Sequence, residues 1–219
     1  MRSAKPSADS ALVLEYVLHS DRSKLKKVLK SRIDPDLIDG NGDPLIFTPI
    51  VNGDRKVLKL MLPYINVNIE SADCRTPLML AVEMGDLDIV KLLIKAAARV
   101  DCKDNSGKTP LLLALEDGKF KIAEYLIKHG SDVNEVDDLG QSALHLVVSG
   151  QHNDCARIIR ILFKCRYIMK DVDHWLSPED LAANQKLQSI YLKQIQNAKA
   201  SIKVNSMESI AIPRECFES

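Results

Sequence analysis

The chain has 219 residues, of which 46% are hydrophobic, so it can bury a sizeable core in one domain followed by a tail. Its 30 basic and 30 acidic side chains cancel, and no overall charge draws it to nucleic acid or to an anionic membrane. The five cysteines form no C-x-x-C pair, which argues against a zinc site and a secreted disulfide framework, and no uncharged apolar stretch approaches membrane-spanning length.

The N-terminal part is predicted to be a polar segment, residues 1–10, followed by a capping helix pair, residues 11–38. Apolar residues at helical spacing run over 11–18 and 24–29. The basic residues between 22 and 32 would form the polar outer face that the end of a repeat array requires. They also fit a nucleic-acid or nuclear-import patch. Because Leu25, Val28 and Leu29 interrupt the basic run at helical spacing, a solvated helix face is the favoured interpretation.

An internal repeat with a period of 33 residues follows: TPLMLA at 76–81 returns as TPLLLA at 109–114 and as SALHLV at 142–147. The threonine can cap a helix, and the proline fits its first turn. Gly85 and Gly118 can end that helix in the left-handed conformation. A second apolar series over 87–93 and 120–126 predicts a second, antiparallel helix. Polar stretches such as 134–140 then suit a tight projecting turn.

Helix, turn, helix and hairpin at this period, with a T-P-L-H-x-A pattern, resemble the ankyrin repeat. The resemblance implies an all-α ankyrin-repeat solenoid of stacked antiparallel helix pairs with projecting β-hairpin loops. We expect four repeats within 39–170, at 39–70, 71–103, 104–136 and 137–170. A degenerate C-terminal capping repeat, 171–196, and a flexible tail, 197–219, should follow.

Two of the four repeats depart from the pattern. The first lacks the threonine, is one residue short and places Pro49 where the family prefers alanine, so its first helix should be kinked or shortened. In the fourth, Ser177 follows Ser142 by 35 residues, which predicts a two-residue insertion within 160–170. The register of residues 160–176 therefore stays open.

The sequence shows no pattern that indicates catalysis. The histidines are scattered, and no Gly-rich phosphate loop, H-E-x-x-H or nucleophile motif in its required context occurs. We therefore predict no catalytic residue, no cofactor and no metal site. His145 takes the histidine position of the family pattern, where the ring ties neighbouring loops together by hydrogen bonds. Cys155 aligns with the core residues Ile89 and Ile122, so we expect it to be buried.

The resemblance implies a non-enzymatic protein–protein interaction module, acting as an adaptor or stoichiometric inhibitor through its concave face and hairpin tips. The alternative is a regulatory subunit that controls a transcription factor in the nucleus. Three recurring leucines on the groove-facing side of the first helices would form an apolar stripe, with core packing as the other explanation. With variable neighbours and loop residues, the candidate contacts are Asp73, Leu80, Glu83, Met84, Asn105, Ser106, Leu113, Glu116, Asp117, Glu135, Asp138, Leu139 and Leu146.

Acidic residues gather around the third hairpin, at Asp132, Glu135, Asp137 and Asp138, whereas basic residues gather in the N-terminal cap and over 157–166. We therefore expect a partner protein with a basic surface, although Asp137 is also suited to stabilising the turn. The protein should be monomeric and cytoplasmic, with the nucleus as an alternative, and should bind neither membrane nor nucleic acid directly. Asn134 resembles the family's asparagine-hydroxylation sites, but a purely structural role in the hairpin is favoured.

Overall fold

The computed structural model describes residues 8–30, 38–39, 42–149 and 155–165. These residues fall into two compact units, 1–105 and 106–219, called the N-terminal and C-terminal units below. The predicted C-terminal capping repeat and the tail lie outside the described residues. So does most of 160–176, the segment whose repeat register the sequence leaves open. Within the described part of the chain, no helix is long and apolar enough to cross a membrane.

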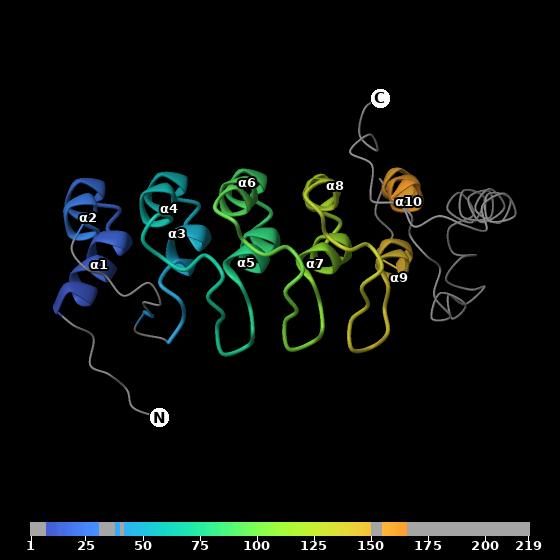
Figure 1. Ribbon diagram of the computed structural model, residues 1–219, viewed down its shortest axis with the longest axis horizontal. Coiled ribbons are helices and arrows are strands. Elements are labelled where there is room, and N and C mark those ends of the chain that lie inside the picture. The colour runs from blue at the N-terminus through green and yellow to red at the C-terminus, as the bar shows by residue number, and fades with distance from the viewer. Residues whose placement is uncertain (1–7, 31–37, 40–41, 150–154, 166–219) are drawn as a thin grey trace, which may run out of the picture. The chain divides into compact units, whose positions relative to one another are not determined.

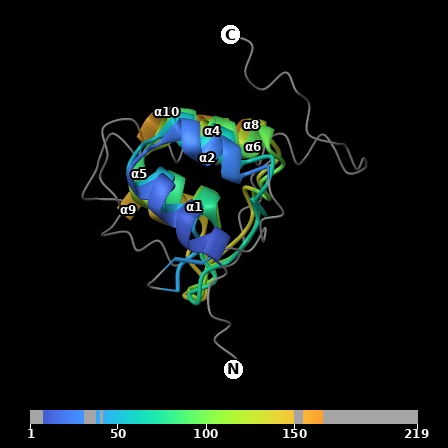
Figure 2. The same ribbon diagram turned by 90° about the vertical axis from the view of Figure 1, so that its left-hand side faces the viewer.

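The N-terminal unit is a stack of three helix pairs in two layers (Figure 1). The first helices of the pairs contact one another along one layer, and the second helices do so along the other. Figure 2 shows the same two layers from the α1 end. The six helices are α1 (Ala8–Leu18), α2 (Arg22–Val28), α3 (Phe47–Val51), α4 (Arg55–Met61), α5 (Pro77–Met84) and α6 (Leu87–Lys95).

The C-terminal unit repeats this arrangement with two pairs, in which α7 packs on α8 and on α9, and α10 packs on α8 and α9. Its helices are α7 (Pro110–Glu116), α8 (Phe120–Lys128), α9 (Ala143–Ser149) and α10 (Cys155–Lys164). The core of both units consists of residues at equal repeat positions. Leu78, Leu111 and Leu144 are each at most 1% exposed, so every pair buries its apolar face on a neighbour.

The first helices α5 and α7 begin at the capping threonines that the sequence predicts, and three second helices are capped by aspartates outside that prediction. Thr76 and Thr109 each accept a hydrogen bond of 3.3 Å from the backbone three residues ahead, and a proline follows each of them. The second helices α2, α4 and α6 begin after aspartates whose carboxylates cap the first turn. Lys119 stands at this position before α8 and forms no side-chain cap.

Pro49 shortens the first helix of its repeat, as predicted. The helix α3 has five residues, whereas α5 has eight. Pro49 lies in the first turn of α3, where backbone amides have no hydrogen-bond acceptor within the helix. Its lack of an amide hydrogen therefore breaks no helical hydrogen bond, and the helix starts late rather than breaking in its middle. The repeat is also one residue short: the turn at Asp39 recurs 32 residues later at Ser71.

The connecting loops are hairpin-like turns, and the described residues contain no regular strand. Isolated antiparallel bridges join Ile38 to Pro44 and Val136 to Ser142. Each turn includes one residue with a left-handed backbone: Gly42 (φ 90°), Cys74 (φ 55°), Gly107 (φ 73°) and Gly140 (φ 75°). Cys74 therefore occupies a position that the other turns give to glycine.

Candidate functional site

The solvent-facing end of each first helix changes its chemistry from repeat to repeat. Leu18, Val51, Glu83 and Glu116 follow one another at intervals of 33, 32 and 33 residues and occupy the same place in four helix pairs. Leu18 is 56% exposed and Val51 is 57% exposed, although both are apolar. The scaffold thus permits either an apolar or a charged side chain at this place.

Two of the predicted contact acids form ion pairs within their own repeats. Glu83 pairs with Arg75, and both carboxylate oxygens of Glu116 lie 2.6–2.7 Å from the Lys108 ammonium. In both repeats the base directly precedes the capping threonine and lies eight residues before the acid. Because these pairs partly neutralise Glu83 and Glu116, a partner would have to compete with the internal bases.

The predicted leucine stripe is wrong for two of its three members. Leu113 is 8% exposed and Leu146 is 3% exposed, so both pack in the interior of the C-terminal unit. Only Leu80 is half-buried and reaches the surface. Packing, the other explanation considered for these leucines, therefore accounts for Leu113 and Leu146.

The other predicted contacts on the first helices reach solvent. Met84 is 49% exposed at the end of α5. Asp117, at the end of α7, is exposed but lies 2.6 Å from the Lys119 ammonium. Met84 therefore remains an apolar contact candidate, and Asp117 is partly compensated within its own repeat.

The third hairpin contains one buried acid and one exposed apolar residue. Asp137 is 5% exposed, and its carboxylate accepts hydrogen bonds from the amides of Leu139 (3.0 Å) and Gln141 (2.7 Å), which gives it the turn-stabilising role considered above. Leu139 is 82% exposed at the tip. Glu135 is half-buried and takes part in further contacts, so Leu139 is the most accessible predicted contact of this loop.

Backbone hydrogen bonds join adjacent loops within each unit. In the N-terminal unit the Asn105 amide donates to the Asp73 carbonyl (3.4 Å), and in the C-terminal unit the Asp138 amide donates to the Ser106 carbonyl (3.0 Å). Asp138 also lies close to Gly107, where an added β-carbon would come within 2.8 Å of the Asp138 amide nitrogen. These predicted contacts are exposed, but their backbones also hold the loops in place.

Asparagines stand at equal positions of two repeats, Asn68 and Asn134. Asn68 donates to the Ala97 carbonyl (3.3 Å) and accepts from the Arg99 amide (2.8 Å), which ties its loop to the following repeat. Asn134 follows two repeats later, is half-buried, and its backbone amide donates to the Asp132 carboxylate (2.8 Å). This bond does not involve the Asn134 side chain, so both its structural role in the hairpin and its hydroxylation stay predictions.

His145 forms a hydrogen bond at the start of its own helix, where its Nδ1 lies 2.8 Å from the Ser142 hydroxyl.

The side chain of Cys155 lies outside the described residues. Cys74, Cys102 and Cys165 are free thiols, and burial raises the pKa of the Cys102 thiol. In the described ranges, no group of three or more histidine, cysteine or acidic side chains is arranged to hold a metal ion.

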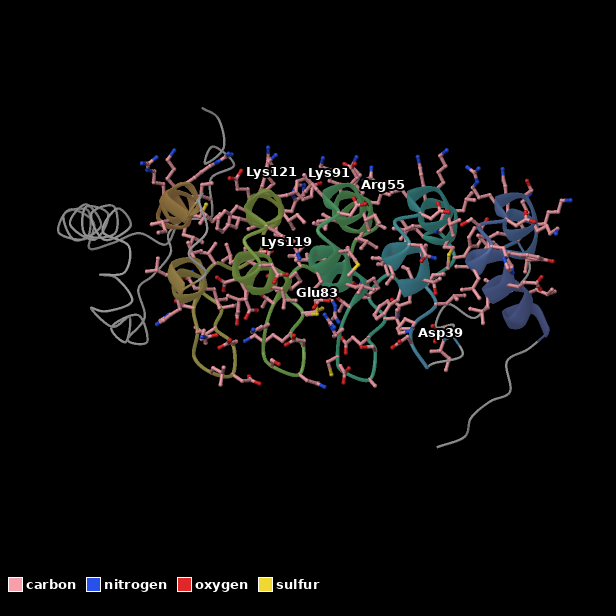
Figure 3. The ribbon with its side chains drawn as sticks, turned by 180° about the vertical axis from the view of Figure 1, so that it is seen from behind. Asp39, Arg55, Glu83, Lys91, Lys119 and Lys121 are labelled. Carbon is pink, nitrogen blue, oxygen red and sulfur yellow. The ribbon has the colours of Figure 1, made fainter. Side chains whose placement is uncertain are left out.

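Charge divides between the two layers of the N-terminal unit. The second helices α2 and α4 carry basic residues and no acid. In Figure 3, Arg55 and Lys91 lie on this side, whereas Asp39 and Glu83 lie on the side of the first helices.

Arg55 bridges two elements, since its guanidinium contacts Asp86 at 3.0 Å and Asp88 at 2.5 Å. Burial raises the pKa of Asp86, but hydrogen bonds from the Ile89 amide and Arg55 outweigh it and lower the pKa below 3.8.

Sequence reasoning missed the exposed apolar residues of the first two pairs, Leu18 and Val51. The signal was available, because aligning the repeats puts both of them at the position of Glu83 and Glu116. In the sequence, Leu18 belongs to the apolar series of the cap, which predicts that it is buried. Its exposure depends on how α1 is rotated against α3, which the periodicity of a single helix does not determine.

The family described as "Ankyrin repeats (3 copies)" matches the chain over residues 14–104 and 96–171. No curated protein matches it. The matched ranges cover most of the chain, begin within α1 and include α2 as well as the repeats with the TPL pattern. Ankyrin repeats are protein–protein interaction modules that are generally non-enzymatic. The matched ranges and the stacked helix pairs together show that the chain belongs to the ankyrin-repeat family.

Proposed function

We propose that the chain is a non-enzymatic adaptor or stoichiometric inhibitor, and that it docks a partner protein on the side formed by the first helices and loops. The supporting observation is the contrast between core and surface at equal repeat positions. Leu78, Leu111 and Leu144 keep one residue type and are buried. At the exposed ends of the first helices, in contrast, the residue changes from leucine to valine and then to glutamate. A fixed scaffold with a variable exposed surface is the arrangement that partner recognition uses.

Affinity capture with the full-length chain from its native cells, followed by mass spectrometry of bound proteins, tests this proposal. The variant Met84→Lys with Leu139→Glu changes two exposed apolar side chains of the proposed side. It should lower recovery of a specific partner about tenfold, with an unchanged thermal midpoint. The matched control, Lys26→Glu with Lys59→Glu, changes the exposed second-helix side and should leave recovery intact. Recovery of only lipid or nucleic acid, or loss of the partner in the control alone, would contradict the proposal.

The recovered partner separates the possible roles. An inhibitor abolishes the partner's activity at one equivalent, whereas an adaptor leaves it unchanged and brings a second protein into the complex. We place the module in the cytoplasm, because Cys74, Cys102 and Cys165 are free thiols, as is usual for proteins of a reducing compartment. Recovery of a DNA-binding protein, with the tagged chain in the nucleus, would instead favour control of a transcription factor.

A further inference from the structure

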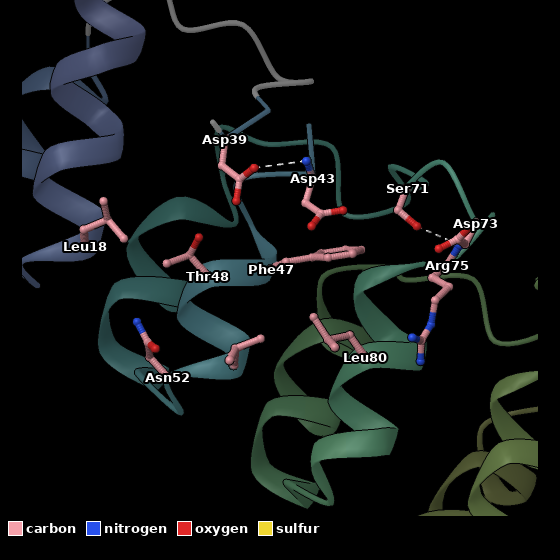
Figure 4. A pocket seen from close by; sticks show the side chains of 11 residues that line it. Leu18, Asp39, Asp43, Phe47, Thr48, Asn52, Ser71, Asp73, Arg75 and Leu80 are labelled. Carbon is pink, nitrogen blue, oxygen red and sulfur yellow. Dashed lines mark hydrogen bonds between the residues drawn. The ribbon is translucent and has the colours of Figure 1, made fainter. Parts of the chain in front are cut away.

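The N-terminal unit contains a hollow of about 500 Å³ on the side of the first helices. Figure 4 shows it between the end of α1, the helices α3 and α5, and the two turns that precede them. Its size fits one or two large side chains of a docked segment rather than a folded domain. The helix α3, which borders the hollow, has five residues and is the shortest helix in the described part of the chain.

Apolar side chains form one wall of the hollow. Leu18 and Val51, both more than half exposed, contribute from α1 and α3, and the half-buried Phe47 and Leu80 contribute from α3 and α5. In the repeats that carry Glu83 and Glu116 the same helix position forms an ion pair with a neighbouring base. Such a pair is absent at Val51, so exposed apolar surface faces the hollow there. Covering that surface with a partner's apolar side chain would remove it from water.

Carboxylates form the rim of the hollow. Asp39 and Asp43 come from one turn, and Asp73 comes from the next. Asp39 accepts a hydrogen bond from the Asp43 amide (3.0 Å) and makes further contacts. Asp43 and Asp73 are exposed, and neither carboxylate meets a cationic side chain among the described residues. The arginine of the rim, Arg75, is already paired with Glu83. At Asp43 and Asp73 the rim thus carries negative charge that the described residues of the unit leave uncompensated.

From this apolar wall and acidic rim, we infer that the hollow binds a peptide segment of the partner that presents a bulky apolar side chain flanked by lysine or arginine. The apolar side chain enters beside Leu18 and Val51, and the flanking bases face Asp43 and Asp73. Since these two acids stand on different turns, they match charges spread along a chain better than the single charge of a small cation. This inference rests on the proposed function and assigns one part of the partner to one part of the surface.

The test uses random 12-residue peptides displayed on phage and selected on the immobilised full-length chain. Val51→Glu is the key variant, because the repeats with Glu83 and Glu116 show that the scaffold accepts glutamate at this position. Peptides enriched by the unmodified chain should carry a bulky apolar residue within about three positions of a lysine or arginine, and Val51→Glu should not enrich them. Enrichment of acidic or uncharged peptides, or equal enrichment by Val51→Glu, would overturn the inference.

Fluorescence anisotropy with one synthetic peptide from the enriched set measures how much each variant changes the binding affinity. Val51→Glu should weaken binding at least tenfold, and Asp43→Asn with Asp73→Asn should weaken it at least threefold and reduce its dependence on salt. Tyr64→Glu, a change at an exposed residue outside the lining, is the matched control and should stay within twofold of the unmodified chain. Unchanged binding in the double asparagine variant would remove the acidic rim from the site.

The outcomes also separate this inference from the proposed function. A captured partner that binds Val51→Glu as tightly as the unmodified chain, but loses affinity for Met84→Lys with Leu139→Glu, would leave the interaction module in place and refute the hollow as its binding site. Peptides that bind at the hollow while no native protein is recovered would support the hollow and contradict the docking role.

Discussion

Among the described residues, three with a β-carbon adopt the left-handed backbone, and each has a glycine at the same position of at least one other repeat. Ser20 (φ 52°) corresponds to Gly53, and Ala97 (φ 65°) corresponds to Gly130. Cys74 (φ 55°) stands at the position of Gly107. A side chain in this conformation costs roughly 1–2 kcal/mol, because the β-carbon approaches the following carbonyl oxygen. The array therefore stores local strain at its turns, and this strain is removable.

Replacing Cys74 with glycine should stabilise the protein. Relief of the left-handed strain is offset in part by the greater entropy of glycine in the unfolded chain, so we expect a net gain of about 0.5–1 kcal/mol in the free energy of unfolding. Urea denaturation followed by circular dichroism measures it. Cys74→Ala is the control, since it removes the thiol but keeps the β-carbon. An equal gain in both variants would mean that the thiol, and not the backbone, is unfavourable.

At the scale of the helix, the sequence predicted where the elements begin and end, because these points depend on short-range chemistry. Thr76 and Thr109 cap, Gly85 ends α5 with φ 72°, and Pro49 shortens α3. Depth of burial was less predictable. Leu80 and Leu113 share a repeat position, yet Leu80 lines the hollow and Leu113 is buried. We attribute the difference to the neighbouring repeat. Leu80 and Thr48 of the short helix α3 line the same hollow, and the apolar pattern within α5 does not indicate which residues stand on that neighbour.

Removing the Asp86 cap should be costly, because this carboxylate holds two elements. Its Oδ1 caps α6 through the amides of Asp88 (2.9 Å) and Ile89 (3.1 Å), and its other oxygen binds Arg55 at the start of α4. Asp86→Ala should cost about 1–2 kcal/mol in chemical denaturation, whereas Asp86→Asn keeps a capping oxygen and should cost less than about 1 kcal/mol. Equal losses in both variants would assign the effect to the ion pair instead of the cap.

The same carboxylate should contribute to acid sensitivity. The pKa of Asp86 is lowered from 3.8 in the folded protein, so its ionised form is stabilised by folding. The contribution of Asp86 to the free energy of unfolding is complete at pH values above 3.8, the ordinary pKa of an aspartate. It is lost as the pH falls through 3.8 toward the lower pKa of Asp86 in the folded protein. The stability difference between the unmodified chain and Asp86→Asn should therefore shrink between about pH 5 and about pH 3, as urea titrations at each pH would show. A constant difference would contradict the lowered pKa.

At the scale of the whole molecule, stability depends on contacts between neighbouring pairs, since a single pair cannot bury its apolar face alone. The N-terminal pair shows this directly. Its residues Val13, Val17, Leu25 and Leu29 are at most 2% exposed, and α1 and α2 contact α3 and α4. On its outer side the basic residues of α2 face solvent. The pair therefore separates the core of the following repeat from water while presenting a charged end.

Removing residues 1–38 should expose the faces of α3 and α4 that now contact α1 and α2, and the truncated protein should aggregate. Light scattering during a thermal ramp measures this aggregation. The charge-reversed control Lys26→Glu with Lys27→Glu keeps the helix pair and should scatter like the unmodified chain.

Leu25→Ala in the full chain provides a milder form of the test. Leu25 is fully buried, so its truncation should lower the free energy of unfolding by about 2–4 kcal/mol. Hydrogen exchange should then accelerate in α2 more than in α6, because opening begins at the weakened end of a one-dimensional stack. A truncated protein that stays monomeric and equally stable, together with unchanged exchange in Leu25→Ala, would show that the first pair does not cap the array.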